Sequence, residues 1–234
     1  MNAVNYQKEL DKILEGLQAD REKDAGTACK ADAGPAPRGT GEVKRLFLHS
    51  CCAPCSSYVL EYLSVYFQIT VFYYNPNISA AEEYRKRAEE QKRLIHTYNR
   101  EMEAGTRRGY PIEVVEGDYE PHKFYEAAKG YEDCPEGGER CFRCFDLRLR
   151  ETVRRAKEAG ADFFCTTLTI SPLKNARKLN EIGMALSAEY GVPWLPSDFK
   201  KKNGYRRSVE LSAEYGLYRQ NYCGCGYSLR DAGN

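Results

Sequence analysis

Short apolar segments alternate with helical patterns between residues 44 and 195, and this alternation limits the chain to few folds. Segments rich in β-branched and aromatic residues predict strands at residues 44–48, 68–74, 111–115, 162–168 and 192–195. Helical periodicity occupies the segments between and after them, at residues 56–66, 79–104, 124–129, 145–160, 176–190 and 208–215. Strands that alternate with helices pair in parallel and take helices on both faces. The sequence therefore predicts an α/β protein with a doubly wound, mostly parallel sheet of about five strands.

The helix expected at residues 79–104 has both a start signal and a clear polar side. Ser79 and Glu82 have the spacing of a capping box at its first turn. The side opposite its apolar stripe carries Arg85, Lys86 and Arg87, which are predicted to be solvent-exposed.

The first 42 residues differ in character from the rest of the chain. Apolar residues recur at helical spacing over residues 3–20, while residues 24–42 are rich in Gly, Ala and Pro without any period. We therefore expect an N-terminal helix and flexible linker over residues 1–42 and one catalytic or binding domain over residues 43–234. The N-terminus lacks the apolar core of a signal peptide, and no run is long enough to span a membrane. These features predict a cytoplasmic protein.

Three cysteines stand at the junction of the first strand and the helix that follows it. The stretch His49-Ser50-Cys51-Cys52-Ala53-Pro54-Cys55 places them where open α/β sheets bind ligands, beyond the carboxyl end of a strand. A helix N-terminus also stabilises thiolates. The chain has ten cysteines, and clustered cysteines in a reducing compartment indicate metal or redox chemistry rather than a disulfide scaffold.

Two further cysteine pairs lie in predicted loops beside strand ends or helix starts. They are Cys141 with Cys144 and Cys223 with Cys225. We expect them to converge with the first group on one crevice, because loops at one end of a doubly wound sheet are neighbours. Seven thiols exceed the four that one zinc or iron–sulfur site needs, which favours a cluster plus a second metal or redox centre. A zinc knuckle is the alternative for Cys141 and Cys144.

The remaining cysteines and the histidine have weaker claims to a role. Cys134 is a less favoured ligand, Cys165 lies inside an apolar strand and is expected in the core, and Cys29 lies in the linker. His49 is either a proton donor to the site or an ordinary hydrogen-bonded residue at a strand end. The polar stretch after the fourth strand, which includes Ser171 and Lys174, either binds substrate or caps the next helix.

A basic segment with interleaved aromatic residues precedes the last cysteine pair. Its cations are Lys200, Lys201, Lys202, Arg206 and Arg207, and its aromatic residues are Phe199 and Tyr205. Residues 218–222 continue the pattern. Cations that contact phosphates and aromatic rings that stack on bases suit RNA loops, although a charge run is often only a solvated face. The net charge of +1 gives no support either way.

The motifs in combination resemble one family. HSCCAPCS, CFRCF, TTLTISPLKN and the C-terminal FKKKNGYRRSVELSAEYGLYRQNYCGC are similar to the QueH-type epoxyqueuosine reductases over about residues 44–230. The resemblance implies a Rossmann-like sheet and a cobalamin-independent oxidoreductase. Its implied reaction is the last step of queuosine biosynthesis, in which the epoxide of epoxyqueuosine at the tRNA wobble position is reduced.

The resemblance also implies a cofactor and roles for individual cysteines. It implies a [4Fe-4S] cluster with Cys51, Cys52, Cys141 and Cys144 as ligands. Cys223 and Cys225 match a redox-active pair or ligands of a second, mononuclear iron, and Cys55 matches a position that is Asp in some members. The implied partners are tRNA, which Lys201, Lys202, Arg206 and Arg207 are expected to bind, and an unidentified electron donor. No phosphate-cradling glycine loop follows the first strand, so we expect no use of ATP.

Two other functions fit parts of the sequence. A zinc-stabilised RNA-binding module would hold zinc and need no spare thiol pair. An ATP-dependent tRNA thiolase would carry a phosphate-binding glycine loop where this chain has CCAPC.

Overall fold

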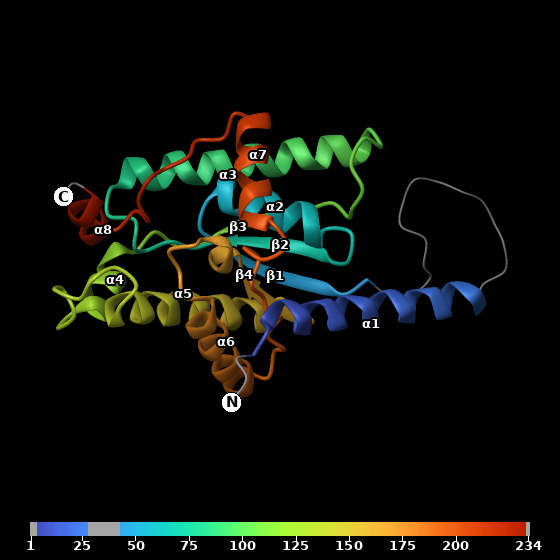
Figure 1. Ribbon diagram of the computed structural model, residues 1–234, viewed down its shortest axis with the longest axis horizontal. Helices are drawn as coiled ribbons and strands as arrows, with labels where there is room; N and C mark the ends of the chain where they lie inside the picture. The colour runs from blue at the N-terminus through green and yellow to red at the C-terminus, as the bar shows by residue number, and fades with distance from the viewer. Residues whose placement is uncertain (1–3, 28–42, 233–234) are drawn as a thin grey trace.

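A computed structural model describes residues 4–27 and 43–232 (Figure 1). Four parallel strands form one sheet in the order β3-β2-β1-β4. Their bounds are β1 Arg45–Ser50, β2 Gln68–Tyr73, β3 Glu113–Glu116 and β4 Phe163–Thr166. The α/β class and the parallel pairing are therefore confirmed.

The prediction of a fifth strand at residues 192–195 is wrong. Trp194 makes only an isolated bridge to Phe164. Proline cannot donate to a ladder, and Pro193 interrupts this segment while Pro196 follows it at once. The segment therefore lies beside β4 without extending the sheet, which has four strands among the described residues.

Eight α-helices and one 3-10 helix are present in the described part of the chain. Their bounds are α1 Tyr6–Thr27, α2 Ala53–Leu63, α3 Ala81–Glu103, α4 Pro121–Ala128, α5 Glu139–Glu158, η1 Thr167–Ile170, α6 Ala176–Tyr190, α7 Gly204–Glu214 and α8 Gly226–Ala232. Helices α2, α3 and α7 lie on one side of the sheet, and α5 and α6 lie on the other (Figure 1). Helix α1 contacts α2, where Tyr62 Oη donates a hydrogen bond to Asp11 Oδ1 at 3.3 Å. None of the helices in the described ranges combines the length and apolar character needed to cross a lipid bilayer.

Several expected helix boundaries differ from the observed ones. Helix α5 begins six residues earlier than predicted, so Cys141 and Cys144 lie in its first two turns. Helix α3 is not capped by Ser79, because its N-cap is Ala80 and the Ser79 hydroxyl instead accepts a hydrogen bond from Gly226 N at 2.8 Å. Helix α8 was not predicted at all.

The core is built on both faces of the central strand. Along β1, Leu46 and Leu48 point to one face and Phe47 and His49 to the other, and all four are buried. Burial on both faces is what a parallel sheet covered by two helical layers requires. The strand that carries the first cysteine group is therefore held rigidly.

The N-terminal helix packs on this core. Leu10 and Leu14 of α1 are almost fully buried in the main hydrophobic cluster. The helix also runs to Thr27, so the linker cannot begin at residue 24 as expected. The remainder of that predicted linker, with Cys29, lies outside the described residues.

Candidate active site

The first cysteine group sits where β1 ends and α2 begins. Cys52 is the N-cap of α2 in extended backbone, and Pro54 occupies the first turn, where its missing N–H costs no hydrogen bond. The tight change of direction gathers the sulfurs of Cys51, Cys52 and Cys55 within 4.8 Å of one another. Cys51 and Cys52 are 3.7 Å apart at sulfur. This is the spacing of donors to one metal ion or cluster corner.

The electrostatics of this group favour a single negative charge among the three cysteines. Hydrogen bonds from Cys52 and Cys55, aided by the positive charges of Arg148 and Lys174, hold the pKa of Cys51 well below its usual value. The interaction with Cys51, aided by burial, raises the pKa of Cys52 to about 12, and that of Cys55 also rises. A thiolate is the form that binds metal or attacks as a nucleophile. Cys51 is therefore the charged member of the group.

The last cysteine pair forms a close dithiol. The sulfurs of Cys223 and Cys225 are 3.4 Å apart. Gly224 between them has φ +107°, and an added Cβ would lie 2.8 Å from Ile78 Cγ1, so glycine is required there. The hydrogen bond between Cys223 and Cys225 is the main reason that the pKa of Cys223 falls well below its usual value, and the charge of Lys174 contributes.

The middle cysteine pair projects from the start of α5 towards the dithiol. Cys144 is buried, and burial raises its pKa to about 11, while Cys141 is half-buried and accepts a hydrogen bond from Gly137 N at 3.2 Å. Burial also raises the pKa of Cys141. Both are therefore neutral thiols unless a metal binds.

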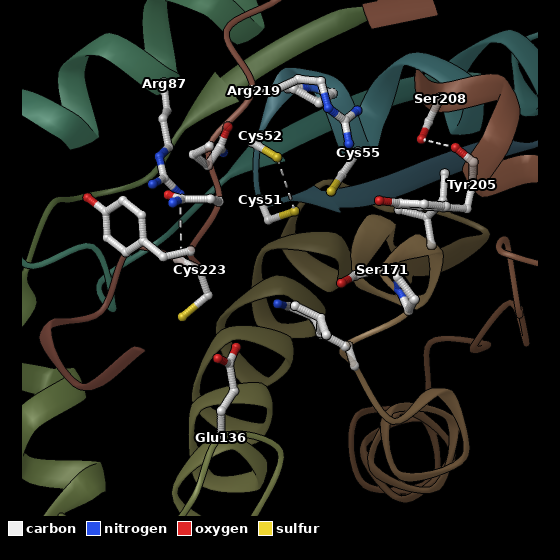
Figure 2. Close-up of a pocket in the computed structure, with 18 of the residues that line it drawn as sticks. Cys51, Cys52, Cys55, Arg87, Glu136, Ser171, Tyr205, Ser208, Arg219 and Cys223 are labelled. Atoms are coloured by element: carbon white, nitrogen blue, oxygen red, sulfur yellow. Dashed lines mark hydrogen bonds between the residues drawn. The ribbon is translucent and has the colours of Figure 1, made fainter. Parts of the chain in front are cut away.

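Two adjoining cavities bring the three cysteine groups together. The larger has a volume of about 330 Å³ and is lined by Cys51, Cys52, Cys55 and Cys223. The smaller is lined by Cys141, Cys144, Cys223 and Cys225. Arg148 and Lys174 line both cavities, as Cys223 does. Figure 2 shows Cys51, Cys52 and Cys55 on one side of the larger cavity and Cys223 on another. The three groups are thus neighbours, although they line two adjoining cavities that share Cys223 rather than the one crevice expected.

His49 is a structural residue rather than a group that faces the cavities. Its ring is fully buried, with Nδ1 2.8 Å from Thr166 Oγ1 and Nε2 3.1 Å from the Tyr74 carbonyl oxygen. Arg148 donates to the same Nε2 at 3.2 Å. Burial and the charge of Arg148 lower the pKa of His49 to about 3, so the ring is neutral. Of the two roles left open by the sequence, the structural one fits.

The chemistry of the donors fits a soft metal centre. The grouped ligand atoms are all sulfur, which suits iron–sulfur clusters, zinc or soft iron sites. Two buried donors nearby, Tyr73 Oη and Arg87 Nη2, have no hydrogen-bond partner among the residues that the structure describes. Cys52 is among the groups that influence the pKa of both side chains, so they lie near its sulfur. Orphaned buried donors indicate space for an additional acceptor, such as the sulfur of a bound cluster.

The cations of the basic segment lie outside both cavities. Arg206 pairs with Glu210 at 3.0 Å, Arg207 with Glu61 at 2.8 Å, and Lys202 with Asp11 at 2.8 Å, whereas Lys201 is exposed. None of the four expected tRNA contacts is a cavity residue. Neighbouring residues do line the larger cavity, and these are Tyr205, Ser208, Arg219, Gln220, Asn221 and Tyr222.

The structure also decides between the roles that the sequence left open for Phe199, Ser171 and the two remaining cysteines of the domain. Phe199 is buried and therefore is a core residue, not a base-stacking platform. Asn175, not Ser171, caps α6 by accepting from Lys178 N at 3.0 Å. Ser171 and Lys174 line the larger cavity, as a substrate-binding role requires. Cys165 is buried in the core as expected, and Cys134 lines neither cavity.

Sequence reasoning missed three charged residues of the site. Arg87 is only 3% exposed, contrary to the expected solvated face, because it reaches under the C-terminal segment. Arg148 and Glu136 were not singled out, yet both line the two cavities. Arg148 follows Cys144 by four residues on α5, and that helical spacing was the available signal.

A parallel α/β sheet with thiols gathered at the carboxyl ends of its strands defines a class of redox or metal-binding proteins. The chain matches the family described as epoxyqueuosine reductase QueH over residues 46–231. An epoxyqueuosine reductase QueH of Staphylococcus epidermidis is 40% identical over 98% of this chain and 87% of its own length. Those of Streptococcus pyogenes and Thermotoga maritima are 44% and 37% identical, over 80% and 79% of this chain and 71% and 90% of their own lengths. The chain belongs to the QueH family.

Proposed function

We propose that this protein reduces the epoxide of epoxyqueuosine in tRNA to give queuosine. The observation that carries the proposal is the gathering of seven thiols around two adjoining cavities in a chain of the QueH family. Removal of an epoxide oxygen as water, leaving a carbon–carbon double bond, consumes two electrons and two protons. A site for this reaction needs a store of electrons beside a pocket that admits the modified base.

We assign the metal ligands on the chemistry of the thiols. Cys51, Cys52, Cys141 and Cys144 are the proposed ligands of a [4Fe-4S] cluster. Cys223 and Cys225 are proposed either as a redox-active dithiol or as ligands of a second, mononuclear iron, and Cys55 lines the same cavity as Cys223. A bound cluster supplies electrons one at a time. The low pKa of Cys51 favours metal binding, and Arg148 and Lys174 offset the negative charge that the ligand sulfurs bring.

The dithiol supports the two-electron step. When Cys223 and Cys225 join as a disulfide, they release two electrons and two protons, which matches the demand of the epoxide. Their sulfurs, 3.4 Å apart, need only a small movement to bond. The disulfide must then be reduced by an external electron donor. The low pKa of Cys223 keeps one sulfur ready to react.

The proposed partner is tRNA that carries epoxyqueuosine in its anticodon, which places the enzyme in the cytoplasm. Tyr222 and Tyr205 at the larger cavity offer aromatic faces to unstacked bases, and Arg219 offers a charge to phosphate. Four further cations lie beside this cavity in sequence and are proposed to contact the anticodon stem. Lys201 and Lys202 lie in the turn before α7, and Arg206 and Arg207 lie on α7. Their acidic partners lower the net charge of this surface, so its contribution is smaller than four free cations would give.

Anaerobic purification followed by iron and sulfide analysis, together with a reduction assay on epoxyqueuosine tRNA, tests the proposal. We expect about four iron and four sulfide per chain for one cluster, with further iron if the second centre is present. We also expect conversion of the epoxide in the presence of a chemical reductant. Bound zinc without iron or turnover would indicate the RNA-binding module instead. Incorporation of sulfur into tRNA with consumption of ATP would indicate a thiolase.

A further inference from the structure

An apolar side chain stands in solvent at the entrance of the larger cavity. Leu173 is 67% exposed, more than any other large apolar residue that the structure describes, and it lines both cavities. The larger cavity also presents cations and amides, among them Lys174, Arg219 and Gln220. A single exposed leucine elsewhere on the surface would need no explanation, but this one stands where a substrate must enter.

The backbone holds Leu173 in a rigid turn. Lys174 N donates to the Ser171 carbonyl oxygen at 3.2 Å, which closes a β-turn. Pro172 occupies its first corner, where proline fixes the backbone, and Leu173 occupies the second. The four residues of η1 before the turn are buried, and the Asn175 side chain caps α6 after it. The leucine is thus presented by a preorganised backbone, which loses little entropy when the side chain meets a partner.

The larger cavity suits a single modified base rather than a stacked loop. Its volume of about 330 Å³ is at the small end of the roughly 300–1,000 Å³ range of ligand pockets. In Figure 2, Ser171 and Tyr205 lie on one side of this cavity and Cys223 lies on the other. Enzymes that act on a base within a stack move that base out of the stack and into their pocket. A base that enters this cavity therefore leaves a gap between its former neighbours in the anticodon loop.

Leu173 has the chemistry to fill that gap. Its side chain has no hydrogen-bonding group, so it gains nothing from phosphates, ribose hydroxyls or base edges. The faces of the bases are the apolar surface of an RNA loop, and they are accessible only where stacking is broken. Proteins that separate stacked bases do so with side chains such as leucine, isoleucine, methionine or phenylalanine.

We propose that Leu173 inserts into the anticodon loop and packs against the base next to the wobble nucleotide, in the space that the wobble base vacates. This inference rests on the proposed function, because it takes the RNA substrate from there. Burial of the leucine against a base stabilises the extruded state and opposes the return of the wobble base to the stack. Leu173 is thus a positioning residue, which contacts the RNA beside the reacting nucleotide.

The test measures the stacking of the neighbouring base. An anticodon stem-loop with guanosine at the wobble position carries 2-aminopurine as the adjacent base, whose fluorescence rises when stacking is lost. Guanosine shares the purine frame of the modified base, so this probe reports insertion without the epoxide chemistry. We expect a rise in fluorescence when full-length, anaerobically purified wild-type protein saturates the stem-loop.

In Leu173→Ala the fluorescence rise at saturation should fall by roughly half or more, and the dissociation constant should increase roughly three- to tenfold. Leu173→Met keeps an apolar side chain of similar size and should restore both. Because Leu173 is mostly exposed, both variants should keep the wild-type unfolding temperature, which separates insertion from a structural role.

Met184→Ala is the matched control, because Met184 is an exposed apolar residue of α6 that lines neither cavity. It should leave affinity and fluorescence unchanged. An unchanged fluorescence rise in Leu173→Ala overturns the inference, with or without a loss of affinity, and so does a wild-type protein that produces no rise. Failure of the proposed function is a separate result, namely a wild-type protein that unstacks the base but leaves the epoxide of epoxyqueuosine tRNA intact.

Discussion

Arg87 donates a hydrogen bond from Nη1 to the carbonyl oxygen of Cys223 at 3.2 Å, which joins α3 to the C-terminal dithiol. Asn77 donates to the same oxygen at 3.3 Å, and Ser79 N donates to the Gly224 carbonyl oxygen at 3.0 Å. The backbone of the dithiol is therefore anchored to the loop after β2. The dithiol is thus held at the cavity by the loop after β2 and by α3, which are both remote from it in sequence.

Gly224→Ala should disrupt this anchor. The backbone at Gly224 has φ +107°, and a Cβ there would lie 2.8 Å from Ile78 Cγ1 and 3.2 Å from Arg87 Nη1. We expect a loss of about 1–3 kcal/mol in the free energy of unfolding and a fall in turnover. Denaturant unfolding and the reduction assay measure both. Gly16→Ala, in open space on α1, is the control and should be neutral or slightly stabilising.

The double change of Cys223 and Cys225 to Ser should abolish turnover while leaving a coloured protein that binds tRNA. Four thiols from the other two groups complete the ligand set of a cubane cluster, so the pair is free for electron storage or a second iron. Visible absorption, iron content and tRNA affinity check the result. Loss of the cluster would show that Cys223 and Cys225 are cluster ligands. Normal turnover would show that the reaction needs no second redox or metal centre at this pair.

Cys141→Ser should remove the visible absorption of the cluster, because serine is a poor ligand for iron in such clusters. Iron and sulfide content should fall with it. Cys134→Ser supplies a matched control, since Cys134 is a half-buried thiol seven residues earlier that lines neither cavity. A Cys141→Ser protein with full iron and sulfide would show that the ligand assignment is wrong.

Deletion of residues 1–42 should lower stability but preserve turnover per folded molecule. No described residue of α1 lines a cavity, yet Leu10 and Leu14 are buried in the core. A single Leu10→Ala change should cost about 2–5 kcal/mol of unfolding free energy. Val4→Ala, at a position that is 62% exposed, should cost little. If the deletion abolished turnover while the cluster and the fold stayed intact, residues 1–42 would contribute to catalysis or to tRNA binding.

Replacing Lys201, Lys202, Arg206 and Arg207 with Ala should weaken tRNA binding and reduce its dependence on salt. Binding of tRNA releases fewer counterions when a phosphate contact is lost. Each lost contact therefore reduces the slope of log K against log salt concentration by at most about one unit. Three of the four cations have acidic partners, so we expect a change of less than four units. Plots of binding constant against salt concentration measure it. An unaltered slope would assign these residues to a solvated surface.

The fold was largely predictable because its signals are local. Four of five expected strands, and the helices between them, follow from periodicity and apolar composition. The prediction of the fifth strand was wrong because each residue of a parallel ladder needs a backbone N–H donor, and Pro193 lacks one. The capping box at Ser79 failed because its hydroxyl accepts a hydrogen bond from Gly226, on a segment that no local pattern could place beside it.

The candidate site was predictable only where its chemistry is rare. Cysteines stand out in a sequence, and all seven that were grouped line the two cavities. Charged residues are common, so Arg87 and Glu136 look like ordinary surface residues until the fold brings them to the cavity. Likewise the basic segment was recognisable by its charge, but its pairing with Glu61 and Asp11 depends on tertiary contacts.

The thiols of the two cavities come from residues 51–55, 141–144 and 223–225, and this separation sets the order of assembly. Their sulfurs meet only after β1 has joined the sheet and the C-terminal segment has docked on Arg87. Because the full set of thiols is gathered only in the folded chain, the free energy of metal binding is coupled to that of folding. A variant that folds slowly would emerge under-loaded with every ligand intact, so the metal content of a purified sample reports folding yield as well as ligand identity.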